Sequence, residues 1–195
     1  MSELLFNELP RPTFRWLRVN HTVSSLAGED TAVQSIAVEA NKNILSPLPV
    51  GTALLDGNYE GANKEAVHVL VEKAEGYAIN VPPKAKEVVG IRIDANARVA
   101  NRFQFIVGEG AELEVQFYVT GSGDALTNVS YLNEYDVKEA GKVVVKKVNL
   151  LPEHVQHIEH RYTKLEEKAD VEYINIEIGG SENILNYYHD LVEIG

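Results

Sequence analysis

The chain contains no cysteine among its 195 residues. This absence excludes disulfides, thiolate nucleophiles, cysteine zinc sites and cysteine-ligated iron–sulfur clusters within the chain. No stretch approaches the roughly 20 apolar residues of a membrane-spanning helix, and the start, MSELLFNELPRP, lacks the basic and apolar regions of a secretion signal. We therefore expect a cytoplasmic protein that does not enter a membrane.

Basic residues are also scarce relative to acidic ones. The chain has 18 lysines and arginines against 29 aspartates and glutamates, a formal net charge of −11. Such a field repels phosphate backbones and anionic membrane surfaces, so nucleic acid is not an expected partner. Hydrophobic residues make up 45% and charged residues 24% of the chain, which is typical of a folded soluble domain.

The signatures of common enzymes are missing as well. The sequence has no GxSxG and no HExxH, and the GSGD that begins at Gly121 lacks the lysine and the following helix of a phosphate-binding loop. The carboxylates are numerous but show no spacing that singles out an acid and base pair. We do not expect an enzyme.

The distribution of turn residues divides the chain into two parts. Prolines and glycines interrupt residues 1–62, which we interpret as an irregular, partly helical N-terminal segment. Residues 63–195 contain short β-rich runs bounded by Gly, Pro, Asp or Asn, and we interpret them as the coils of an all-β domain. The runs are AVHVLV from Ala66, YAINV, VVGIRI, FQFIV, LEVQFYV and VVVKKVNL.

Apolar and polar residues alternate within these runs. In LEVQFYV, Leu113 to Val119, every second side chain is apolar, and Ile174, Ile176 and Ile178 alternate with polar residues in the same way. A period of two places the apolar side chains on one face of an extended strand, whereas a helix would scatter them around its axis. These runs therefore predict strands.

A repeat of about 29 residues links three of the strands. Glu109, Glu139 and Glu167 each stand two places before a small residue and a β-run, and these small residues are 30 and 28 positions apart: Ala111, Gly141, Ala169. Such a period predicts a parallel β-helix in which small residues form stacked corners. An antiparallel sandwich or barrel is the competing interpretation. The shorter DANARV, from Asp94, is either an earlier copy of the corner or lies outside the repeat.

Three of the six histidines lie within HVQHIEH, His154 to His160. In a strand, His154 and His160 share a face but stand about 20 Å apart at about 3.3 Å per residue, and His157 is on the other face. A helix would offer two ligands at most.

A 29-residue coil would instead stack Tyr131, His160 and His189 at the strand spacing. We take His160, His189 and His157 as candidate metal contacts, and the competing interpretation is that they are scaffold positions.

Three segments together resemble the SufB/SufD family of iron–sulfur cluster assembly proteins, and its SufD-like members most. LPRPTFRWLRVN, from Leu9, is similar to the family's N-terminal segment. IRIDANARVANRFQFIVGEGAELEVQFYV, from Ile91, resembles the opening of the family's β-helix. HVQHIEHRYTKLEEKADVEYINIEIGGS, from His154, resembles the coils that follow.

The resemblance implies a right-handed parallel β-helix that works as a non-enzymatic scaffold in the cytosolic SUF pathway. It also implies association with a SufB-type homologue and a SufC-type ATPase. We expect no cofactor in this chain, with iron or a cluster bound only in a complex. The alternative function is a β-helix that binds carbohydrate or processes polysaccharide.

The chain also departs from the family pattern. It stops at VEIG, within a predicted strand, where the family continues through further coils, and it has no match for the family's late cysteine and histidine. We therefore expect a β-helix that is incomplete at its C-terminus, either a truncated or shortened relative or one whose unpaired sheet edge is covered by a homodimer.

Overall fold

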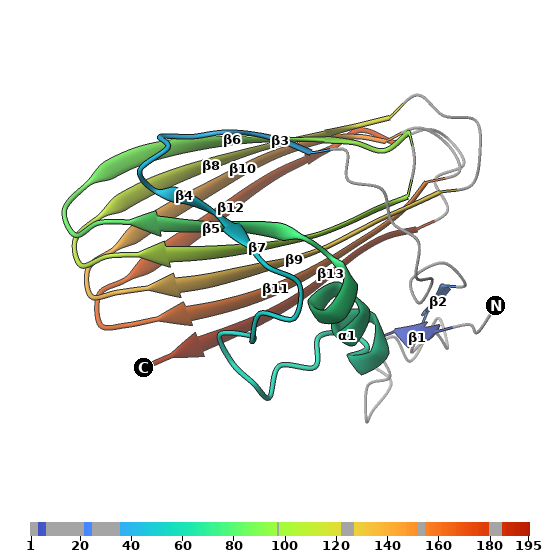
Figure 1. Ribbon diagram of the computed structural model, residues 1–195, viewed down its shortest axis with the longest axis horizontal. Helices are drawn as coiled ribbons and strands as arrows, with labels where there is room; N and C mark the ends of the chain where they lie inside the picture. Colours follow the sequence, from blue (N-terminus) through green and yellow to red (C-terminus); the bar gives the residue numbers. More distant parts are fainter. Residues whose placement is uncertain are drawn as a thin grey trace, which may run out of the picture.

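Two β-sheets face each other across a shared interior, and the chain alternates between them (Figure 1). One sheet has five strands in the order β12-β10-β8-β6-β3, and the other has six in the order β13-β11-β9-β7-β5-β4. This computed structural model describes residues 4–6, 22–24, 36–96, 98–121, 127–151, 155–179 and 185–195, with only the backbone described for 22–24 and 185–189.

The described secondary structure consists of thirteen strands and one helix. The strands before the helix are β1 (Leu4–Phe6), β2 (Thr22–Ser24), β3 (Ile36–Glu39) and β4 (Leu45–Leu48). The helix is α1 (Lys64–Lys73). The strands after it are β5 (Gly76–Val81), β6 (Lys86–Asp94), β7 (Val99–Val107), β8 (Glu112–Thr120), β9 (Thr127–Val137), β10 (Lys142–Leu150), β11 (Val155–Leu165), β12 (Asp170–Glu177) and β13 (Leu185–Ile194).

Strands from β5 onward pair in parallel with the strand one coil later. In the five-stranded sheet, Lys86 pairs with Glu112, Glu112 with Lys142 and Lys142 with Asp170, so successive coils are 26, 30 and 28 residues long. The prediction of a parallel β-helix is therefore confirmed, and the antiparallel sandwich is wrong for this part of the chain. The predicted alternation is also confirmed, because Leu113, Val115, Phe117 and Val119 are all buried.

The predicted corners stack on one another at the tight turns between the sheets. The amide of Lys142 donates to Ala111 O at 2.8 Å, and that of Asp170 donates to Gly141 O at 2.9 Å. One residue before each small residue, the backbone is left-handed at four equivalent positions: Lys84 (φ 63°), Gly110 (φ 61°), Ala140 (φ 54°) and Lys168 (φ 60°). The turn therefore keeps one conformation from coil to coil.

The earlier copy of this corner is not DANARV. The stack begins at Ala85, whose carbonyl oxygen accepts from the amide of Glu112 at 2.8 Å. Ala95, within DANARV, instead donates its amide to Thr120 O at 2.6 Å, at the other end of the strands. The short motif lies in the opposite corner of the coil, so its acidic and small residues only imitate the repeat.

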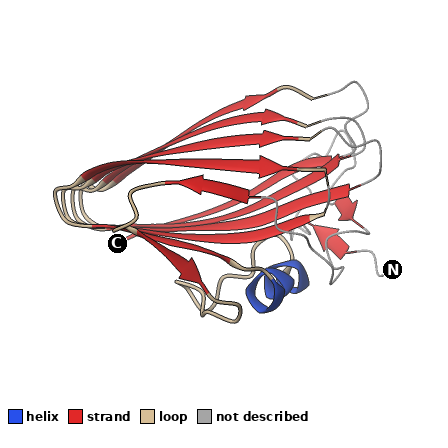
Figure 2. Cartoon of the chain, turned by 45° about the horizontal axis from the view of Figure 1, so that its top comes forward, coloured by secondary structure: helices blue, strands red, loops and turns tan. Residues whose placement is uncertain are grey.

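The run AVHVLV is helical, and its prediction as a strand is wrong. It lies inside α1, where Asn63 caps the N-terminus by accepting a hydrogen bond from the Ala66 amide. Ala66, Val67 and Leu70 are the buried residues of this helix, a spacing that fits one helical face better than a strand face. The helix covers the outer side of the six-stranded sheet (Figure 2).

The described part of the N-terminal segment contributes strands rather than helix. β3 pairs antiparallel with β6, and β4 pairs antiparallel with β5. These two strands close the first edge of each sheet. Between residues 36 and 61 the structure describes strands and turns and no helix, while LPRPTFRWLRVN lies outside the described residues.

Aromatic stacking fills the middle of the interior. Phe105 lies over Tyr135 with ring centroids 4.7 Å apart, and Phe103 meets Phe117 edge to face at 5.8 Å. These rings come from both sheets and from successive coils, so the interior is continuous along the stack. Among the described residues, no helix is long and apolar enough to cross a membrane.

The stacked left-handed positions generate a matched pair of stability predictions. Gly110→Ala should destabilise the fold by about 1 kcal/mol because an L residue disfavours a positive φ. A Cβ at Gly110 would meet only Lys84 Cγ at 3.8 Å, so crowding contributes little. Ala140→Gly, at the equivalent position one coil later, should be neutral or stabilising. Urea unfolding measures both, and equal losses in the two variants would contradict the backbone explanation.

Candidate functional site

Strand β11 is buried on both of its faces and carries the described histidines of the HVQHIEH tract. His157 points into the interior, where its Nε2 lies 2.9 Å from the Tyr131 hydroxyl. His160 lies on the outer face, where its ring is 6.4 Å from that of Phe6 and is covered by the loop at Gly61. His154 lies outside the described residues.

The backbone register corrects the predicted histidine stack by one residue. His160 pairs with His189 of β13, as the 29-residue repeat predicts. On the other side His160 pairs with Leu132, and Tyr131 pairs with Glu159, because the coil between β9 and β11 is 28 residues long. Tyr131 therefore leaves the proposed stack, and its side chain meets His157 inside the coil instead.

These placements limit what the histidines can coordinate. His157 and His160 project to opposite faces of β11, so they cannot share one ion. Among the described residues, no group of three or more His, Cys, Asp or Glu side chains is arranged to hold a metal. The alignment of His160 with His189 is one of backbone positions.

The most polar part of the interior is a cluster that the sequence did not single out. We call Asn133, Lys147, Glu159, Arg161 and Asp190 the interior charge cluster. Lys147 Nζ donates to a Glu159 carboxylate oxygen, and Asn133 Nδ2 donates to the other at 2.7 Å. The Lys147 and Glu159 side chains are 0% and 1% exposed, so this ion pair is fully removed from water.

Arg161 connects this cluster to the next coil. Its Nη2 donates to Asp190 Oδ2 at 2.6 Å, and its Nε lies 3.8 Å from Glu159 Oε1. The guanidinium also lies 4.4 Å from the ring centroid of Tyr173, opposite it in the interior. Four charged groups of alternating sign therefore link β10, β11 and β13.

Aromatic rings enclose the charges and shift their pKa values. Lys147 Nζ lies 5.1 Å from the ring centroid of Tyr131 and 5.5 Å from that of Phe117. Burial, and then the nearby Arg161 charge, lower the pKa of Lys147 well below its usual value. Burial also raises the pKa of the Tyr173 hydroxyl to about 12, although its contact with Thr163 opposes this shift. The cluster is thus a dry, paired network.

Strand parity could have revealed this cluster. In VVVKKVNL, Lys147 shares the face of Val143 and Val145, which is the buried face, whereas Lys146 shares the exposed face. Likewise, Glu159 and Arg161 share the face of His157. A charge on an apolar face predicts a buried partner, but parity alone does not identify that partner.

A second feature is a shallow groove on the outer side of the five-stranded sheet. It has a volume of about 330 Å³ and lies over Gly90, which leaves the outer face without a side chain at that point. Arg92 lies 5.6 Å from the ring centroid of Tyr118 at its wall. Glu39, Gln116 and Lys146 complete the polar lining.

Comparison with known proteins gives one match. Residues 91–195 match the model of the family described as "SUF system FeS cluster assembly, SufBD core domain". The matched part runs from within β6 through β13, so it contains both the histidine strand and the interior charge cluster. Searches of curated proteins and of solved structures found no significant match.

The buried ion pair generates a prediction about two neighbouring lysines. Lys147→Met should lower the free energy of unfolding by about 3–5 kcal/mol because it leaves the Glu159 carboxylate buried without its cation. Lys146→Met removes the adjacent lysine, which pairs with Glu114 at the surface and should cost less than about 1 kcal/mol. Urea unfolding compares them, and similar losses in both variants would contradict the assignment.

The lowered pKa of Lys147 generates a prediction about pH. A lysine whose pKa falls on folding destabilises the folded state at low pH, and this cost disappears as pH rises past the ordinary lysine value of 10.5. Two variants without the carboxylate isolate the effect: Glu159→Gln and Lys147→Met/Glu159→Gln. The double variant should be the more stable at pH 7, and their unfolding free energies should converge as pH approaches 10.5. A pH-independent difference would contradict the prediction.

Proposed function

Because the chain belongs to the SufB/SufD family through its SufBD core domain, we propose that it acts as a non-enzymatic scaffold subunit in iron–sulfur cluster assembly. Family membership supports a role in the SUF system, whose SufBD components are in general assembly scaffolds rather than enzymes. The observation that carries the proposal is the family match over a parallel β-solenoid.

The composition of the chain defines what such a scaffold can supply. It has no cysteine, so thiolate ligands for a cluster must come from another chain. Its histidines and carboxylates are ligands that iron accepts, and they could supplement those thiolates. The cluster is therefore cargo of the complex rather than a resident cofactor of this chain.

The partners we propose are a SufB-type homologue that carries cysteines and a SufC-type ATPase. β12 and β13 are the last strands of the two sheets, and within the described part of the chain no strand pairs with their far sides. Unpaired strand edges offer backbone donors and acceptors to another chain. The SufB-type homologue is the proposed occupant of these edges, and a homodimer through the edge is the competing arrangement.

The candidate iron contacts remain His160 and His189, with His157 as a separate position inside the coil. His160 is buried beneath Phe6 and the Gly61 loop, so an ion could reach it only if that cover moved. The backbone alignment with His189 provides at most two ligands. A partner chain would have to complete the coordination.

The alternative of a carbohydrate-binding β-helix rests on the groove over Gly90. That groove does combine basic and aromatic side chains, Arg92, Lys146 and Tyr118. However, Lys146 is already engaged by Glu114 at 2.8 Å, and the family match favours cluster assembly.

Co-purification tests the scaffold proposal. The tagged chain, co-expressed with the SUF components of its source, should retain a cysteine-bearing homologue and the ATPase through size exclusion. Aerobic and anaerobic preparations should be compared, since cluster loading could alter the association. A clean preparation without any SUF component under both conditions would count decisively against this role.

Metal analysis tests the histidine contacts separately. If the purified complex contains iron beyond that held by its thiolates, His160→Ala should reduce the iron stoichiometry because it removes one imidazole ligand. His68→Ala, on the exposed side of α1, serves as the control. Unchanged iron in His160→Ala would remove that residue from consideration.

A further inference from the structure

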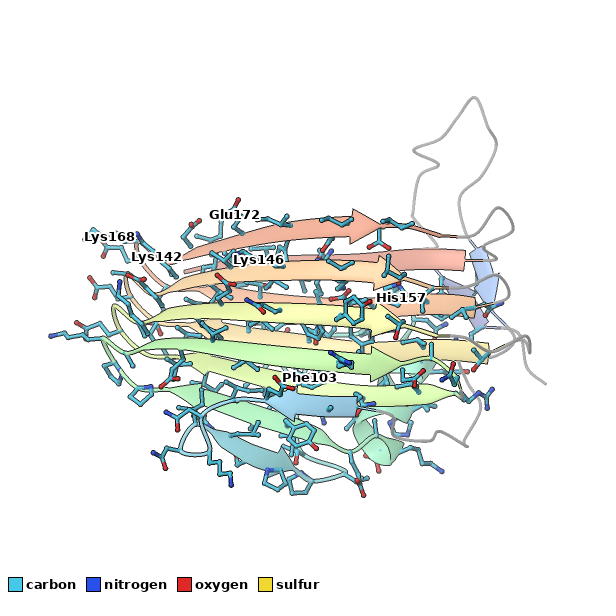
Figure 3. The ribbon with its side chains drawn as sticks, turned by 90° about the horizontal axis from the view of Figure 1, so that it is seen from above. Phe103, Lys142, Lys146, His157, Lys168 and Glu172 are labelled. Atoms are coloured by element: carbon cyan, nitrogen blue, oxygen red, sulfur yellow. The ribbon has the colours of Figure 1, made fainter. Side chains whose placement is uncertain are left out.

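The outer face of the five-stranded sheet exposes large apolar side chains. Val88, Tyr118, Ile174 and Ile176 are 56%, 41%, 40% and 49% exposed. The corresponding face of the six-stranded sheet is covered by α1 and by the strand β1. Contiguous exposed apolar surface on a folded domain commonly marks an interaction site. Figure 3 looks onto this outer face, on which Lys142, Lys146 and Glu172 lie.

Charges alternate in sign across one row of this face. The parallel register places four exposed side chains side by side on successive strands, in the order Lys86, Glu112, Lys142, Asp170. Lys86 Nζ lies 2.8 Å from Glu112 Oε2, and the side chains of this pair remain 74% and 49% exposed. When read from the opposite end, the row has the opposite sign at every position. It is therefore complementary to a reversed copy of itself.

A second row combines a hole with a knob. The register places Gly90, Gln116, Lys146 and Ile174 side by side on the outer face. The groove of about 330 Å³ lies over Gly90 at one end of this row, and the exposed Ile174 stands at the other end. Reversing the row therefore brings the protruding side chain over the groove.

We propose that this outer face is the interface of a homodimer, with a two-fold axis parallel to the strands between β8 and β10. This single operation places Lys86 opposite Asp170 of the second copy and Glu112 opposite its Lys142. It also seats Ile174 in the groove over Gly90 and sets Tyr118 against Val148. Each contact occurs twice, as an isologous interface requires.

The dimensions of sheet packing permit this arrangement. Two sheet faces pack about 10 Å apart with their strand directions within about 30°. Contacts near the axis keep their alignment under such a rotation, and the long lysine and glutamate side chains can span the offset that grows toward the row of charges. Glu114, on the intervening row, is neutralised within its own chain by Lys146 at 2.8 Å. A chain of net charge −11 would otherwise oppose self-association, so local pairing of unlike charges is required.

Charge swapping tests the proposal on the full chain. Sedimentation velocity over a dilution series should show the wild-type chain at twice its mass of 21.6 kDa. Lys142→Glu sets like charges opposite each other twice per dimer, and it should weaken association at least tenfold. Lys42→Glu makes the same change of net charge in the β3–β4 turn, away from the face, and should leave association unchanged.

The double variant Glu112→Lys/Lys142→Glu separates contacts between chains from contacts within a chain. It turns the row into two positive residues followed by two negative residues, which spoils the alternation within the sheet. Across the proposed axis every pair remains unlike in sign, so the double variant should dimerise like the wild type. Continued weakness of the double variant would overturn the proposed pairing.

The groove provides an independent arm of the experiment. Gly90→Phe fills the groove and should weaken the dimer at least tenfold, and Ile174→Lys should do the same from the other side of the contact. Circular dichroism and thermal unfolding confirm that each variant is folded. A monomeric wild-type chain would overturn the proposal, as would a dimer that none of these face variants affects, since that dimer would pair through its strand edges. Neither result bears on co-purification with SUF components.

Discussion

Parallel hydrogen bonding between one coil and the next is the constraint on which the rest of this structure depends. Each strand from β5 onward satisfies its backbone groups on the strands before and after it, so its register fixes which side chains stack. The left-handed corners at Gly110 and Ala140 return the chain from one sheet to the other in the same way each time. Everything that lies in the interior follows from this repetition.

The repetition explains why much of the fold could be predicted from the sequence. The small residues Ala111, Gly141 and Ala169 are separated by the distances that the strand register later shows, because a corner crowded by its neighbours admits little else. The period-two alternation likewise identified the buried face of β8 correctly. The helical run from Ala66 was misread since a short apolar stretch carries no clear period.

The candidate site was less accessible to prediction, for a related reason. An average period of 29 residues aligned His160 with His189 but misplaced Tyr131, because individual coils differ by a residue or two. A displacement of one residue moves a side chain to the opposite face of a strand. The partner of Lys147 could not be found by counting at all, because Glu159 reaches it across the interior from the other sheet.

That contact across the interior has a consequence for how the chain selects its alignment. Lys147 belongs to β10 and Glu159 to β11, so the salt bridge ties the two walls of the coil together. If either strand slipped by one position, one ion would rotate to the outside and leave its counterion stranded in a dry aromatic enclosure. Such misalignments would be penalised heavily, so these residues proofread the winding of the chain while apolar neighbours, which tolerate exchange, supply the bulk of cohesion.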